Sequence, residues 1–96
     1  MNATQRSNRV IVTVIGQDRV GIIAGVATIL ADASANILDI SQSIMEEFFV
    51  MIMMVDLENA TVPFEALKQR LAAKGDEMGL RIDAQHEDVL KYMHRV

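Results

Sequence analysis

The sequence predicts a single α+β domain whose secondary structure follows the order βαββαβ, and three observations support this fold class. Four segments carry β-branched runs or apolar residues at every second position, and two segments carry apolar residues at helical spacing. Strands 9–15 and 48–57 are apolar on both faces, whereas strands 38–44 and 80–85 are apolar on one face only. We therefore expect a ferredoxin-like antiparallel sheet of order 4-1-3-2 with both helices on one face.

The first strand and helix are predicted by a change of period. Residues 9–15 read RVIVTVI, a β-branched run that favours an extended strand. Residues 21–33 then carry apolar residues on one helical face, namely Ile22, Ile23, Val26, Ile29, Leu30 and Ala33. Asp18 precedes this helix at the place of a cap or near-cap.

Residues 38–44 and 48–57 predict a hairpin around Glu46 and Glu47. Because neither glutamate favours a positive φ, we expect a four-residue loop rather than a two-residue turn. An even loop would pair Ile44 with Phe49 and place one set of side chains against the helices, namely Leu38, Ile40, Ile44, Phe49, Met51, Met53 and Val55.

The opposite face of the same hairpin is also apolar at its centre. It collects Phe48, Val50, Ile52, Met54 and Met45 beside Asp39, Ser41 and Ser43. Two helices on the other side leave this surface uncovered, so a symmetric partner or the C-terminal tail must remove it from water. We expect a homodimer, with the tail assisting.

The second half of the chain repeats the pattern. Pro63 in the first turn, with Thr61 as a candidate cap, opens a second helix that Gly79 can end, although Gly75 disfavours its last turn. Its apolar side carries Phe64, Leu67, Leu71 and Met78. A strand over 80–85 follows. The expected organisation is a disordered segment over 1–8, one domain over 9–86, and a short helical tail over 87–96.

Composition excludes several classes of protein. The net charge of -4 argues against a nucleic-acid partner, and the absence of cysteine excludes disulfides and thiolate metal sites. No apolar run approaches the roughly 20 residues that span a membrane, and the polar N-terminus favours a cytoplasmic protein. His86 and His94 lack the converging ligands of a metal site, so we expect neither metal nor cofactor.

The most polar connection, over residues 16–21, is the strongest candidate for chemistry. Glycines and the N-terminus of the following helix suit an anion such as a carboxylate, and Asp18 could meet an ammonium group. On the alternative interpretation, Asp18 only caps the helix and Arg19 is a solvated side chain. Asn36 likewise has an alternative role as a residue in left-handed conformation after the first helix.

The run DRVGIIA over 18–24, followed by Asn36-Ile37 and Asp39, resembles the signature of the ACT domain over about residues 9–86. ACT domains are ferredoxin-like regulatory modules that usually bind amino acids at a dimer interface. The stretches 37–42 and 93–96 are similar to small stand-alone ACT proteins of the glycine-cleavage repressor kind.

The resemblance implies a ligand site made of Asp18, Arg19, Val20, Gly21, Ile22, Asn36 and Ile37. Asp18 stands where serine-sensing ACT domains place an amide, and Asn36 matches their second ligand contact. The chain departs from the family pattern at three positions, with Gly16 for a histidine, Val20 for a proline and Ser34 for a glycine.

The resemblance therefore favours a non-catalytic sensor that binds an amino acid or similar metabolite in a homodimer and signals to an unnamed effector protein. A ligand-free interaction module suits the same features apart from the loop pattern. An acylphosphatase-like hydrolase using Arg19 and Asn36 is a weaker alternative, because no Gly-rich phosphate loop leads into Arg19. RNA binding is disfavoured, since only Phe48 or Phe49 could stack on a base.

Overall fold

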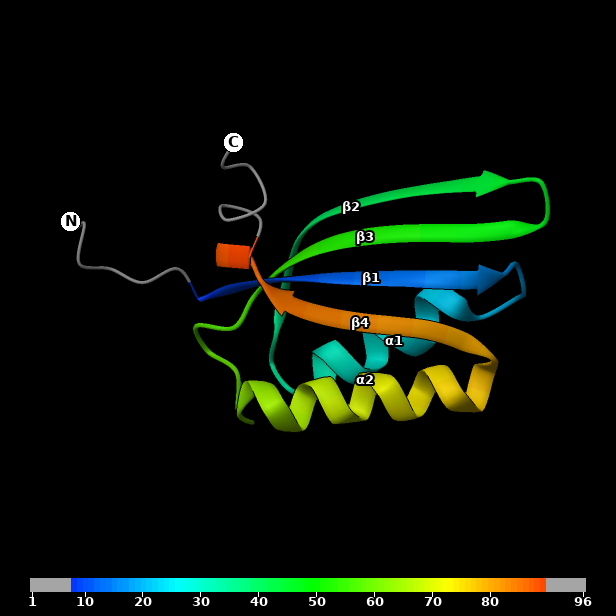
Figure 1. Ribbon diagram of the computed structural model, residues 1–96. Coiled ribbons are helices and arrows are strands. Elements are labelled where there is room, and N and C mark those ends of the chain that lie inside the picture. The colour runs from blue at the N-terminus through cyan, green and yellow to red at the C-terminus, as the bar shows by residue number, and fades with distance from the viewer. Residues whose placement is uncertain (1–7, 90–96) are drawn as a thin grey trace.

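The computed structural model describes residues 8–89, which form the six predicted elements in the predicted order (Figure 1). Their bounds are β1 (Arg9–Gln17), α1 (Ile22–Asp32), β2 (Asn36–Met45), β3 (Phe48–Asp56), α2 (Phe64–Met78) and β4 (Leu80–His86). Among these residues, no helix is both long and apolar enough to cross a membrane.

The strands form one antiparallel sheet in the order β2-β3-β1-β4, which confirms the predicted arrangement. Both helices lie on the same side of the sheet (Figure 1). On that side the apolar residues of the central strands are buried, as their alternation predicted: Val10, Val12 and Val14 of β1, and Phe49, Met51, Met53 and Val55 of β3. Leu30 of α1 and Leu71 of α2 complete the core on the helix side of the sheet.

The prediction that β2 packs against the helices is wrong for most of its apolar residues. Leu38, Ile40 and Ile44 remain 46%, 42% and 56% exposed. Figure 1 shows α2 running along β4, and neither helix covers these three side chains. Ile37 is the one residue of β2 that packs against the core.

The β2–β3 connection is also tighter than predicted. Met45 pairs directly with Phe48, so Glu46 and Glu47 alone form the turn instead of a four-residue loop. Glu46 has a φ of 60°, which is the left-handed conformation that we expected glutamate to disfavour. The backbone N–H of Asp18 donates a hydrogen bond to the carbonyl oxygen of Glu47 at 3.0 Å, which attaches the turn to the end of β1.

A register shift near Leu38 changes the far end of the hairpin. Ile44 pairs with Phe49 as predicted, but Ile37, not Leu38, stands opposite Val55. The shift lies between Ile37 and Asp39, where the β2 strand has an irregularity of the β-bulge kind. The predicted pairing of Leu38 with Val55 is therefore wrong.

Neither predicted helix cap is made by a side chain. The residue before α1 is Gly21 and the residue before α2 is Pro63, and neither helix start receives a side-chain hydrogen bond. Asp18 is therefore not a cap of α1. The backbone N–H of Thr61 instead donates to the carbonyl oxygen of Ala33 at 2.9 Å.

The expected terminal helix over 87–95 lies mostly outside the described residues, which end at Val89. Glu87 is anchored where β4 ends: its backbone N–H donates to the carbonyl oxygen of Arg9 at 3.1 Å. Its carboxylate also forms an ion pair with the Arg9 guanidinium at 3.0 Å. The expected disordered segment over 1–8 likewise falls outside the description except for Asn8.

The helix α2 continues through Gly75 to Met78, and the lack of a side chain at Gly75 allows close packing of the helix on β4. A Cβ at Gly75 would lie 2.7 Å from the backbone oxygen of Leu80. We expect Gly75→Ala to lower the free energy of unfolding by about 1–3 kcal/mol, since backbone must move to relieve the overlap.

Gly25→Ala is the matched control for this prediction in urea-induced unfolding. Its new Cβ would meet the flexible Met78 side chain, with the sulfur 3.2 Å away, and alanine favours helix by about 1 kcal/mol. Equal stability of the two variants would contradict the close-approach explanation.

Candidate functional site

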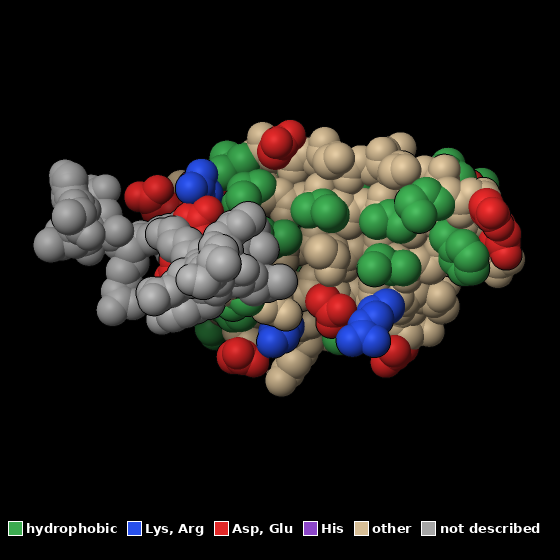
Figure 2. All heavy atoms as spheres, turned by 45° about the horizontal axis from the view of Figure 1, so that its top comes forward, with side chains coloured by type: hydrophobic (Ala, Val, Ile, Leu, Met, Phe, Trp, Pro, Cys, Tyr) green, Lys and Arg blue, Asp and Glu red, His purple; other side chains and the backbone are tan. Residues whose placement is uncertain are grey.

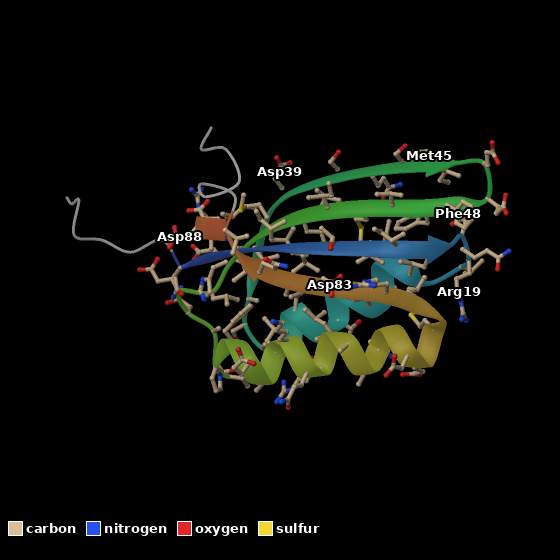
Figure 3. All side chains as sticks on the ribbon, in the orientation of Figure 1. Arg19, Asp39, Met45, Phe48, Asp83 and Asp88 are labelled. Atoms are coloured by element: carbon tan, nitrogen blue, oxygen red, sulfur yellow. The ribbon has the colours of Figure 1, made fainter. Side chains whose placement is uncertain are left out.

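The connection between β1 and α1 is held at both sides by hydrogen bonds. The backbone N–H of Asp18 is bonded to Glu47 at the hairpin turn, and Arg19 Nη1 donates to the carbonyl oxygen of Met78 at 3.2 Å. The loop is therefore fixed between the β2–β3 turn and the C-terminal end of α2. Figure 3 shows Arg19 at the same end of the sheet as Met45 and Phe48.

The loop then enters α1 through a glycine. Gly21 has φ 92° and ψ 2°, and its carbonyl oxygen accepts the backbone N–H of Gly25 at 2.9 Å. The N–H groups of residues 22–24 precede this first helical bond and are available to an anion. Val20 is 96% exposed beside them, whereas Ile22 is buried and anchors the helix in the core.

Asn36 and Ile37 begin β2. Asn36 is exposed and pairs with Asp56, while Ile37 is half-buried and pairs with Val55. Left-handed backbone after α1 occurs at Ser34, which has φ 57°, so the alternative role given to Asn36 is wrong. Ser34 is the position at which the ACT pattern has glycine, and its conformation is the one that glycine favours.

The predicted site residues do not meet within one chain. Asn36 pairs with Asp56, which pairs with Arg9, the first residue of β1, whereas the loop follows Gln17, its last residue. The nine residues of β1 span about 26 Å at the usual strand rise. The loop and Asn36 therefore lie at opposite ends of the sheet.

This separation bears directly on the hydrolase alternative. An acylphosphatase-like site needs Arg19 and Asn36 to hold the same phosphate, and one chain places them at opposite ends. The two side chains therefore do not form a phosphate site within one subunit.

Sequence reasoning missed two features of this region. The Glu46–Glu47 turn adjoins the loop through the hydrogen bond from Asp18 to Glu47, and no sequence pattern indicated that contact. Ile40 and Ile44 form an exposed apolar strip on the helix side of β2, with exposed Ile23 on α1 as a further uncovered residue. Their alternation was visible in the sequence, but their exposure was not.

No group of three or more His, Asp or Glu side chains converges within residues 8–89 in a way that could hold a metal ion. His86 instead packs at a tilt against Phe64 at the start of α2, with ring centroids 4.7 Å apart and an interplanar angle of 52°. His94 lies outside the described residues.

Sequence comparison now adds to this geometry. A profile of the ACT domain matches residues 8–85. A small protein of Methanocaldococcus jannaschii, named as a UPF0237 protein, is 56% identical over 89 residues, which cover 93% of this chain and 99% of that protein.

Solved structures agree with the fold. An ACT domain protein from Streptococcus pneumoniae superimposes with a TM-score of 0.76 at 32% identity, covering 88% of this chain and 96% of that one. A putative glycine cleavage system transcriptional repressor gives a TM-score of 0.69 at 22% identity over 80% of this chain and 44% of that one. At that identity the second likeness shows the fold alone.

The left-handed backbone of Gly21 gives a testable prediction for substitutions at this position. Its φ of 92° is rare for residues with a Cβ, most of all for β-branched ones, although no atom lies within 4 Å of a new Cβ. We expect Gly21→Val to lower the free energy of unfolding by about 1–2 kcal/mol, and Gly21→Asn to cost less.

Urea-induced unfolding measures both effects, with Val20→Ala as the control. The Val20 side chain lies in solvent, so its removal should change stability by about 0.5 kcal/mol at most. If Gly21→Val were as stable as the parent chain, the left-handed conformation of this loop would be refuted.

Proposed function

Because the chain belongs to the ACT domain family, we propose that it is a non-catalytic sensor that binds an amino acid or similar small metabolite between two copies. ACT domains are typically regulatory ligand-binding modules. The observation that carries the proposal is the position of the two halves of the site, which lie at opposite ends of a sheet in which β2 is an edge strand among residues 8–89.

A two-fold axis perpendicular to the sheet, standing beside the outer edge of β2 at the middle of the strand, joins these halves. It pairs the two β2 strands antiparallel, so Asn36 of one copy lies beside the Met45 end of the other. The loop after β1 is bonded to the hairpin turn at that same end. Each Asn36 therefore approaches the loop of its partner, and two equivalent sites form.

The surface around β2 suits such a contact. β2 is an edge strand, and unpaired edge backbone is a template for pairing with another chain. Ile40 and Ile44 on its helix side, and Ile23 on α1, are exposed apolar side chains that the partner would cover. The result is a continuous sheet with the helices of both copies on one side.

The chemistry of the joined site favours an amino acid. The N–H groups of residues 22–24 offer donors to a carboxylate at the positive end of α1. Asp18 supplies an acceptor for an ammonium group, and the partner's Asn36 supplies an amide that can both donate and accept. Val20, fully open at the loop, would contact the ligand side chain or the partner.

A ligand-free interaction module is the second candidate, favoured by the exposed apolar residues on both sides of β2 and β3, among them Ile44, Met45 and Ile52. It predicts the same dimer with no small-molecule binding. In the sensor, the signal would pass to an effector protein.

Thermal unfolding against a panel of the twenty amino acids tests the sensor. A ligand at 100 times its dissociation constant stabilises by about 2.7 kcal/mol, which raises Tm by on the order of 10 °C in a domain of this size. We expect one chemical class of amino acid to raise Tm, and Asn36→Ala and Asp18→Ala each to abolish the rise. Unfolding without ligand should remain nearly unchanged, because both side chains are exposed.

Mixing the two variants tests whether the site is shared between copies. In a mixed dimer, one site combines an intact loop with an intact Asn36, so random exchange should restore about a quarter of the sites. Calorimetric titration counts them. No restoration after subunit exchange would contradict a shared site, and no response to any amino acid would favour the ligand-free module.

A further inference from the structure

The C-terminal end of α2 lacks a cation of its own. Its last turn contains no basic residue and carries Asp76 and Glu77 instead. Because a helix C-terminus has partial negative charge, carboxylates in this turn are unfavourable. Lys74 pairs with Glu77, with 3.2 Å between Nζ and Oε1, but it stands before the last turn. A cation supplied by another part of the chain would therefore stabilise this end of the helix.

Arg19 supplies this cation from the connection between β1 and α1. Its Nη1 donates to the carbonyl oxygen of Met78, the last residue of α2, at 3.2 Å. Figure 3 shows Arg19 at the end of the molecule where α2 passes into β4. The last carbonyl groups of a helix have no partner within the helix, and an arginine that binds one of them also meets the negative end of the dipole. The guanidinium that the family resemblance assigns to the ligand is thus engaged within the protein.

The start of the same connection is packed on the junction that follows α2. Gly79 ends the helix in left-handed conformation, with φ 71°, and Leu80 then pairs with Gly16. A Cβ at Gly16 would lie 3.3 Å from Leu80 Cα and 3.4 Å from the carbonyl oxygen of Gly79. The chain on both sides of Asp18 is therefore held against the end of α2 and the start of β4, while the Asp18 N–H is bonded to Glu47.

We propose that Arg19 is a positioning residue of the ligand site: it fixes the loop between β1 and α1 on the end of α2 and does not itself contact the ligand. This role rests on the proposed sensor and determines how that site keeps its shape. The loop carries Asp18 and leads into the N–H groups of residues 22–24, so its conformation sets their relative position. A loop that is already ordered loses less entropy on binding. Loss of the bond to Met78 lowers the fraction of chains whose loop is ready to bind.

Amide hydrogen exchange without ligand tests the contact itself. We expect Arg19→Ala to lower the protection factor of the Asp18 N–H, whose bond to Glu47 depends on the position of the loop. The expected loss is about 3- to 10-fold, the factor that one hydrogen bond of ordinary net strength supplies. Arg19→Lys keeps a cation and a donor, so it should restore most of the protection.

Arg81→Ala is the matched control, because it removes the same charge without touching the loop. Arg81 lies on β4 between the buried Leu80 and Ile82, hence on the sheet face opposite the helices, where Figure 2 shows apolar side chains gathered. Its Nε donates to Asp83 Oδ2 at 3.0 Å, and its side chain is 78% exposed. The protection factor of the Asp18 N–H should therefore equal that of the parent chain.

Affinity separates positioning from direct contact. The probe is the amino acid that raises Tm most among the twenty, titrated calorimetrically into the parent chain and into Arg19→Ala. If Arg19 only positions the loop, affinity falls by about 2-fold or more, but by no larger factor than the protection of the Asp18 N–H, since only the conformational equilibrium changes. A guanidinium bonded to a carboxylate contributes more, and its loss would weaken binding about 10- to 100-fold. Arg19→Lys should restore affinity together with protection.

Three results would overturn the positioning role. They are parental protection of the Asp18 N–H in Arg19→Ala, an affinity unchanged in that variant despite the lost protection, and an affinity loss larger than the loss of protection. The last would make Arg19 a ligand contact. If no amino acid binds the parent chain, the sensor fails, while hydrogen exchange still decides whether Arg19 holds the loop.

Discussion

Two helices can cover one face of a four-stranded sheet, and this limit governs the rest of the molecule. The central strands β1 and β3 are apolar at almost every position, so their alternation supplies apolar side chains to both faces. The helices bury one set on their own side of the sheet. The sheet face opposite the helices and the exposed apolar residues of β2 are left uncovered for the same reason. The apolar surface that remains uncovered therefore lies mainly on the sheet.

Most of the fold could be predicted because periodicity reports burial directly. The two-sided apolar pattern of 9–15 and 48–57 identified the central strands, and the topology followed. The failures came where position, not pattern, decides exposure. Ile40 and Ile44 have the alternation of buried residues, but no helix reaches them. The turn at Glu46 was mispredicted because its left-handed backbone is maintained against the preference of the residue, in a turn that is hydrogen-bonded to Asp18.

The candidate site was harder to predict than the fold, although part of the necessary information was present. In the order 4-1-3-2 the first two strands run parallel, so the end of β1 and the start of β2 must lie at opposite ends of the sheet. The predicted topology thus already separated Asp18 from Asn36. What it lacked was any sign of the second copy that we propose joins them, because symmetry between copies leaves no mark in the periodicity of one sequence. The hydrogen bond from Asp18 to Glu47 was equally invisible, since it joins backbone atoms.

That hydrogen bond connects the proposed ligand loop to the hairpin turn. The loop is attached to the turn between β2 and β3, and the residues flanking this turn, Met45 and Phe48, lie on the sheet face opposite the helices. In the proposed sensor, a ligand that favours one position of the loop would, through this bond, favour one position of the turn. The proposed sensor would in this way convert the presence of a small molecule into a change at the β2–β3 turn that an effector protein can recognise.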